Sequence, residues 1–173
     1  MALILALQPV SASFNPVVTV VERALGTITT SVAIALVAAQ VVGGVLGAVV
    51  ANLMFDLDAV AVSRQERHGG GLLLGEAVAT FGLVLVVFGA LRSGRVETVA
   101  YAVGGYIAAA YWFTSSTSFA NPAVTVARTV SDSFAGIAPS SVPAFIALQV
   151  VGGGLAALTV RYLYPSADPQ EAP

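Results

Sequence analysis

The chain has 173 residues, of which 57% are hydrophobic and 9% charged, and its mean hydropathy is +0.90. A soluble domain normally carries about 25% charged residues, so this composition predicts a membrane protein. The net charge of −2 excludes nucleic-acid binding as the main function. Cysteine is absent and His68 is the single histidine, so we expect no metal site, no cofactor and no enzymatic activity.

The first predicted element along the chain is a short helix that begins at an Asn-Pro pair. Residues 13–20 read Ser-Phe-Asn-Pro-Val-Val-Thr-Val. Asn is a favoured N-cap and Pro is favoured at the first helical position, so a single pair of this kind indicates an ordinary helix start. The helix predicted over residues 15–25 rises about 15 Å, which is half of a ~30 Å hydrocarbon core.

Four longer segments are apolar over the length that a helix needs to cross a bilayer, about 20 residues. Their apolarity is continuous, which favours helices over the alternating strands of a membrane barrel. Glu76 is the only charge well inside any of them. In chain order the segments cover residues 30–54, 72–91, 96–114 and 142–164.

A second Asn-Pro piece lies between the third and fourth of these segments and repeats the first. Residues 118–126 read Ser-Phe-Ala-Asn-Pro-Ala-Val-Thr-Val, and they predict a second short helix over residues 121–130. The sequence Gln-Val-Val-Gly-Gly also occurs twice, at residues 40–44 and 149–153. Two matched motifs at similar spacings indicate an internal repeat.

The number of spans between the two Asn-Pro motifs predicts how the repeats are related. An odd number, three, places the two short helices on opposite faces of the membrane, so the repeats have inverted topology. Asn15 and Asn121 are then expected to meet at mid-membrane, where the positive ends of two helix dipoles repel cations. Polar backbone at that depth is tolerated where it lines a wet cavity, which predicts a water-filled pore.

These residues resemble the major intrinsic proteins, the family of aquaporins and glycerol facilitators. The resemblance covers about residues 8–164. It rests on the paired boxes Asn15-Pro16-Val17 and Asn121-Pro122-Ala123, each followed by Val-Thr, and on the span that opens with Gly75-Glu76.

The resemblance implies an all-α membrane fold with six spans and two re-entrant half-helices. It also implies a homotetramer in the lipid bilayer of the plasma (inner) membrane, with each multi-pass subunit forming a passive channel for small neutral solutes. Asn15 and Asn121 would donate hydrogen bonds to the permeant molecule. Glu76 would be a buried carboxylate that holds carbonyls of the second re-entrant loop.

The chain departs from the family pattern first in length. Asn121 lies 49 residues after Leu72, an interval that holds two spans, whereas 14 residues precede Asn15. About two N-terminal spans are therefore expected to be missing, and residues 1–8 are at most the end of the second family span. Four full spans remain.

The second departure concerns the selectivity filter, where most family members place an Arg directly after the second Asn-Pro-Ala. That position is Val124 here, and the other filter positions would be Ser118 and Ala109. Arg128 follows one turn later, and we interpret it as a surface or interface residue at a helix end. The resulting wide, weakly polar mouth resembles a bacterial subgroup often linked to metalloid hydroxides such as arsenite.

The sequence therefore predicts a channel for water, glycerol-like solutes or metalloid hydroxides. Two alternatives stay open: a secondary transporter subunit, for which Glu76 is the single intramembrane acid, and a non-conducting truncated remnant. The expected organisation is an incomplete first repeat (1–55), a linker loop (56–71), a complete second repeat (72–164) and a disordered tail (165–173).

Overall fold

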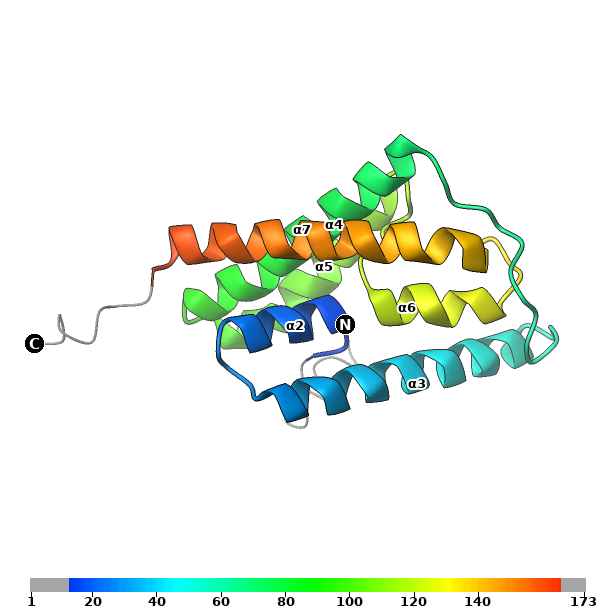
Figure 1. Ribbon diagram of the computed structural model, residues 1–173, viewed down its shortest axis with the longest axis horizontal. Helices are drawn as coiled ribbons and strands as arrows, with labels where there is room; N and C mark the ends of the chain where they lie inside the picture. Colours follow the sequence, from blue (N-terminus) through cyan, green and yellow to red (C-terminus); the bar gives the residue numbers. More distant parts are fainter. Residues whose placement is uncertain (1–12, 166–173) are drawn as a thin grey trace, which may run out of the picture.

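The structure is a computed structural model that describes residues 13–165. The all-α fold predicted from the sequence is confirmed over these residues (Figure 1). The predictions for residues 1–8 and for the tail beyond Pro165 lie outside the described part. The helices are α2 (Pro16–Ala24), α3 (Thr30–Met54), α4 (Gly70–Arg92), α5 (Val99–Phe113), α6 (Pro122–Ala127) and α7 (Val142–Leu163), with 3-10 turns at Val96–Thr98, Arg128–Val130 and Pro139–Ser141.

Three stretches in the described part of the chain are long and apolar enough to cross a membrane: Thr30–Met54, Gly70–Arg92 and Pro139–Leu163. The segment predicted as a fourth span, residues 96–114, differs from the expectation. It begins with a 3-10 turn, and α5 itself has 15 residues, which rise about 22 Å against a ~30 Å core. Continuous apolarity does not distinguish the two helix types, and no residue of the 3-10 turn is buried.

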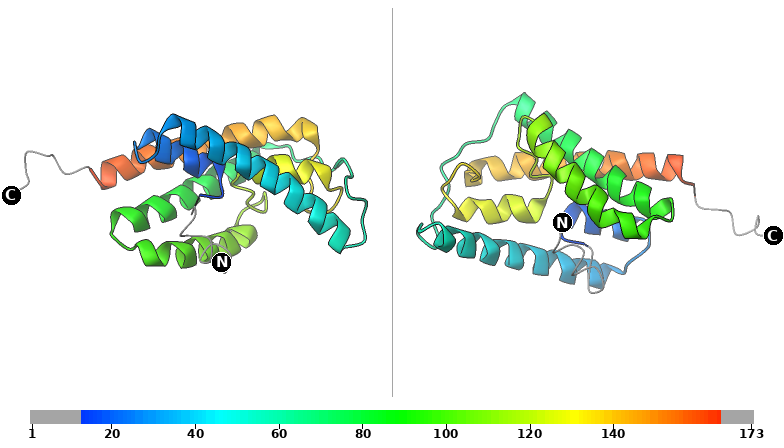
Figure 2. Two further views of the ribbon diagram at one scale, coloured as in Figure 1. Left: turned by 90° about the horizontal axis from the view of Figure 1, so that it is seen from below. Right: turned by 180° about the vertical axis from the view of Figure 1, so that it is seen from behind.

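The two short helices extend in opposite directions from the point where they meet (Figure 1). α2 runs back beside α7, and α6 runs the other way between α3 and α7. α4 and α5 form an adjacent pair, which Figure 2 shows most clearly from behind. This arrangement agrees with the inverted relation predicted for the two Asn-Pro motifs.

The duplicated Gly-Gly pairs allow each long helix to approach a half-helix of the other repeat. A Cβ atom at Gly44 of α3 would lie 3.3 Å from the Ala123 carbonyl oxygen of α6. A Cβ atom at Gly153 of α7 would overlap the side chain of Val17 in α2. Small residues at these two crossings therefore seat the half-helices against the spans.

The duplicated glutamines make matching bonds to the duplicated Val-Thr-Val. The Gln40 amide donates to Thr19 Oγ1 of α2 at 2.9 Å, and the Gln149 amide donates to Thr125 Oγ1 of α6 at 2.9 Å. Thr19, Thr125 and Gln149 are fully buried. The sequence repeat thus reflects a repeated side-chain network, which stabilises both half-helices at buried positions.

Most of the surface of α3 is apolar and exposed. Among its 25 residues, Ala33 and Asn52 are buried, while Ile34, Leu46 and Leu53 have 57–66% of their surface accessible. A helix with this pattern is compatible with a hydrocarbon environment and not with water.

Candidate functional site

The two Asn-Pro motifs meet and are linked by reciprocal hydrogen bonds. Asn15 Nδ2 donates to the carbonyl oxygen of Ala120 at 2.6 Å, and Asn121 Nδ2 donates to the carbonyl oxygen of Phe14 at 2.9 Å. The predicted approach of the two asparagines is confirmed. Each amide group has two protons, so one proton on each Nδ2 remains after these bonds are formed.

Each asparagine also caps the half-helix that it begins. Asn15 Oδ1 accepts from the Val17 amide at 3.0 Å, and Asn121 Oδ1 accepts from the amides of Ala123 at 2.9 Å and Val124 at 3.3 Å. Capping fixes the side chains, so the remaining amide proton of each has a defined direction. The positive ends of both helix dipoles face each other at this point.

A cavity of about 290 Å³ adjoins this contact and has mainly apolar walls. The described residues that line it come from α2, α4, α5 and the second re-entrant loop with α6. They include Asn15, Val18, Glu22, Leu83, Val87, Val103, Tyr106, Ser118, Asn121, Val124 and Arg128.

Four predicted site residues line this cavity, and the others do not. Asn15, Asn121, Val124 and Ser118 border it. The prolines provide the first helical positions, Val17 packs in a core cluster with α4 and α7, and Ala123 faces α3. The residues without a place in the cavity wall are Pro16, Val17, Pro122, Ala123 and Ala109.

Ala109 does not border this cavity, and its assignment to the filter stays a prediction. Ala109 is exposed, and the face of α5 that borders the cavity contains Val99, Val103 and Tyr106. These positions recur every three or four residues and would continue to Ala110, which is fully buried. Ala109 precedes that position by one residue, and each residue turns a helix by 100°.

Glu76 of α4 is buried against the second re-entrant loop, but it holds amides and not the carbonyls that were expected. Its carboxylate accepts from the backbone N–H of Phe119 and of Ala120, both at 2.9 Å, and from the Gln149 side-chain amide at 2.5 Å. A carboxylate accepts hydrogen bonds, so N–H groups are its natural partners. The side chain is 0% exposed.

The loop that Glu76 holds is conformationally strained. Thr117, Ser118 and Ala120 have φ values of 61°, 50° and 45°, in the left-handed region that costs a non-glycine residue about 1–2 kcal/mol. The same Ala120 residue receives the Glu76 bond on its N–H and the Asn15 bond on its carbonyl oxygen. Glu76 therefore positions the acceptor that anchors the first Asn-Pro motif.

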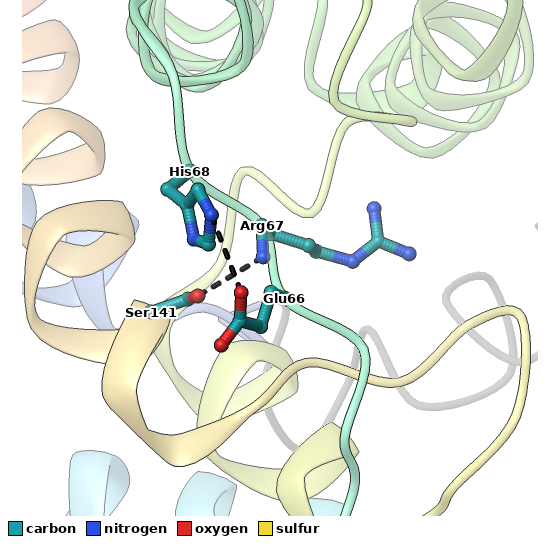
Figure 3. Close-up of polar contacts among 4 residues, drawn as sticks. All are labelled: Glu66, Arg67, His68 and Ser141. Atoms are coloured by element: carbon teal, nitrogen blue, oxygen red, sulfur yellow. Dashed lines mark hydrogen bonds and ion pairs between the residues drawn. The ribbon is translucent and has the colours of Figure 1, made fainter.

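Sequence analysis did not identify Arg67, which holds the loop between α3 and α4 over the second half-helix. Its backbone N–H donates to Ser141 Oγ at 3.0 Å. Figure 3 shows its guanidinium directed away from Ser141 and from the exposed ion pair of Glu66 and His68. An exposed ion pair of that kind contributes little to stability. Arg67, in contrast, is 6% exposed, so its hydrogen bonds are formed away from water.

The Arg67 guanidinium donates to three backbone carbonyl groups from two distant segments. The acceptors are Gly136 at 2.7 Å, Phe134 at 2.8 Å and Ser116 at 3.2 Å. Burial lowers the pKa of Arg67 from its ordinary value, and the negative charge of Glu76 opposes that shift. The guanidinium remains charged, since Arg does not lose its proton in proteins.

Replacing Arg67 with Ala should lower the free energy of unfolding by about 2–3 kcal/mol, because three buried carbonyl groups lose a charged donor. Titration of the purified protein with dodecyl sulfate in mixed micelles measures this difference. The matched control is Arg64→Ala, since the Arg64 side chain is exposed on the same loop. Equal stability of the two variants would contradict a structural role for Arg67.

Arg128 lies at the end of α6, as expected, where it is the C-cap residue, but it is partly buried and not on the outer surface. Its guanidinium carbon lies 4.4 Å from the centre of the Phe119 ring, and Arg128 borders both the central cavity and a second cavity beside α3. Arg67 contacts the same ring at 4.7 Å. The position of Arg128 depends on Phe119, which sequence spacing alone does not bring near it.

No family model matches the chain. It is 44% identical over 168 residues to aquaglyceroporin AqpS of Rhizobium meliloti (strain 1021), and the alignment covers 96% of this chain and 72% of the relative. The chain belongs to the major intrinsic protein family. As a member of the major intrinsic proteins it is a multi-pass protein of the plasma membrane and a channel for water or small solutes, not an enzyme.

Proposed function

We propose that the chain forms a passive channel selective for small uncharged solutes, with a pathway through the cavity at the paired asparagines. The observation that carries this proposal is the reciprocal bonding of Asn15 and Asn121 beside a mainly apolar cavity. Each asparagine retains one amide proton for a passing oxygen atom. The apolar walls offer no such partner, so a solute meets donors at one narrow zone.

The geometry supports neutral solutes over cations for an electrostatic reason. Two capped half-helices direct the positive ends of their dipoles to the zone where the asparagines meet. A cation there is repelled and also loses its hydration shell, whereas a neutral hydroxyl compound exchanges water bonds for amide bonds.

Light scattering by proteoliposomes tests the proposal. Vesicles that contain the full-length protein should take up glycerol, and exchange water, faster than protein-free vesicles, while their proton and sodium permeabilities stay at the protein-free level. Uptake of glycerol and water at the protein-free rate would refute the channel. A requirement for a sodium or proton gradient would favour the secondary transporter instead.

Val124 should determine the width of the mouth. An Arg at this position brings five donors and a bulky charged group into the cavity wall. We expect Val124→Arg to reduce uptake of glycerol and of trihydroxy metalloid compounds at least about tenfold, and water exchange less. Val124→Leu, which adds volume without charge, is the matched control. Equal losses for water and glycerol would indicate simple blockage.

We further propose that metalloid hydroxides such as arsenite are among the permeant solutes and that the full-length protein is a homotetramer. The absence of a bulky side chain at Val124 and the small Ser118 beside it support a wide mouth. Arsenite uptake by the vesicles and native mass spectrometry of the purified protein test these two statements separately.

A further inference from the structure

One face of α2 carries three residues that line the central cavity. They are Asn15 at the N-cap, Val18 three residues later and Glu22 seven residues later. Positions separated by three, four and seven residues lie along one side of a helix. Glu22 is partly buried and lies two turns from the point where the asparagines meet.

The second half-helix carries the same series with the opposite charge. Asn121, Val124 and Arg128 have the same spacing and line the same cavity. The two series agree at their first and second members and differ at the third, which is a carboxylate in one and a guanidinium in the other. Since α2 and α6 extend in opposite directions from the asparagines (Figure 1), the two charges lie toward opposite ends of the pathway.

The guanidinium of Arg128 is placed by an aromatic ring and not by an acid. It lies over Phe119 and donates no hydrogen bond to any residue in the described part of the chain. A cation on the face of an aromatic ring is held in place while its donors remain available. Arg67, on the same ring, has its guanidinium engaged by three carbonyl groups. Arg128 therefore presents a positive charge with unengaged donors at the cavity wall.

We propose that Glu22 and Arg128 are a pair of selectivity residues, one at each end of the pathway, that exclude ions of opposite sign. A fixed charge beside a narrow path of low dielectric raises the energy of any ion of the same sign. Two fixed charges of opposite sign in series obstruct both cations and anions, while a neutral solute passes both. This assignment rests on the proposed function and adds the residues that determine ion exclusion.

Single thiols test the two local potentials without any need for conduction. The chain has no cysteine, so Val124→Cys and Val18→Cys each place one thiol a turn before a charge. The rates of reaction with an anionic and a cationic methanethiosulfonate are measured on protein in detergent, where both ends are open. The anionic-to-cationic rate ratio at Val124→Cys should fall about tenfold with Arg128→Gln, and that at Val18→Cys should rise about tenfold with Glu22→Gln.

The two ends serve as controls for each other. Arg128→Gln should leave the ratio at Val18→Cys within about twofold, since the distant thiol is largely screened from that charge. Arg128→Lys should preserve the ratio at Val124→Cys, and Arg64→Gln, an exposed arginine, should preserve it too. Unchanged ratios on removal of either charge would overturn the proposal, and so would thiols that react with neither reagent.

Ion fluxes in proteoliposomes then separate this proposal from the proposed function. Arg128→Gln should raise potassium permeability and Glu22→Gln should raise chloride permeability, each about tenfold. A wild-type protein without glycerol uptake would refute the channel, while the thiol ratios would still decide the charge assignment. Glycerol uptake with ion permeabilities unaffected by either substitution would overturn the charge pair alone.

Discussion

Replacing Glu76 with Ala should lower the free energy of unfolding by about 3–5 kcal/mol, because two buried backbone N–H groups and one buried side-chain amide lose their acceptor. These donors belong to Phe119, Ala120 and Gln149. The strained loop also loses the bonds that oppose its relaxation. Titration with dodecyl sulfate in mixed micelles measures the change, and glycerol uptake should fall with it because Ala120 anchors Asn15.

Two variants make the Glu76 experiment specific. Glu76→Gln keeps one oxygen acceptor but turns an NH₂ group toward a second donor, so we expect about half of the Ala effect. Thr80→Val is the matched control on the same helix, because Thr80 is buried and its hydroxyl bonds only the Glu76 carbonyl oxygen. A loss for Glu76→Ala no larger than that for Thr80→Val would show that the loop holds its shape without the carboxylate.

Replacing Asn121 with Asp should raise proton and sodium permeability at least about tenfold, since a carboxylate offsets the positive dipole ends where the two asparagines meet. The carboxylate also cannot donate to the Phe14 carbonyl oxygen that Asn121 Nδ2 now contacts at 2.9 Å. We therefore expect some loss of stability as well. Proteoliposomes loaded with a pH-sensitive dye measure the proton flux.

The control for Asn121→Asp is Asn121→Ala. This variant loses the same hydrogen bond to Phe14 and adds no charge. It also loses the helix cap, which Asp retains, so it is the more disruptive of the two changes. It should retain the exclusion of sodium even where its stability falls by about 1–2 kcal/mol. Equal ion leakage through the two variants would assign the effect to a loosened loop and not to electrostatics.

The elements that sequence analysis predicted well are those fixed by local chemistry. Asn15 and Asn121 cap their helices as the Asn-Pro pairs predict, and their approach follows from counting spans. Glu76 was identified because a carboxylate inside an apolar span requires partners. No sequence pattern predicts that the partners of Glu76 are backbone amides. The conformation of the re-entrant loop determines which backbone groups point toward the carboxylate.

The features that were missed depend on contacts between distant segments. Arg67 bonds carbonyl groups 49–69 residues away, and charge-rich loops normally indicate solvent exposure. Glu22 was not singled out from the sequence, and its match with Arg128 emerges only when both half-helices line one cavity.

Each half-helix packs against a long helix of the other repeat, and this arrangement constrains the order of membrane assembly. α2 rests against Gly153 of α7, and Asn15 bonds a residue 105 positions later in the chain. Translation adds about 5–20 residues per second, so the first half-helix lacks its seat for on the order of 10 s after it is made. During that interval the Asn15 side-chain amide lacks the Ala120 carbonyl oxygen that it bonds in the complete fold. Insertion of α7 then supplies the helix against which α2 packs, and it supplies the Gln149 amide that bonds Thr125 of α6.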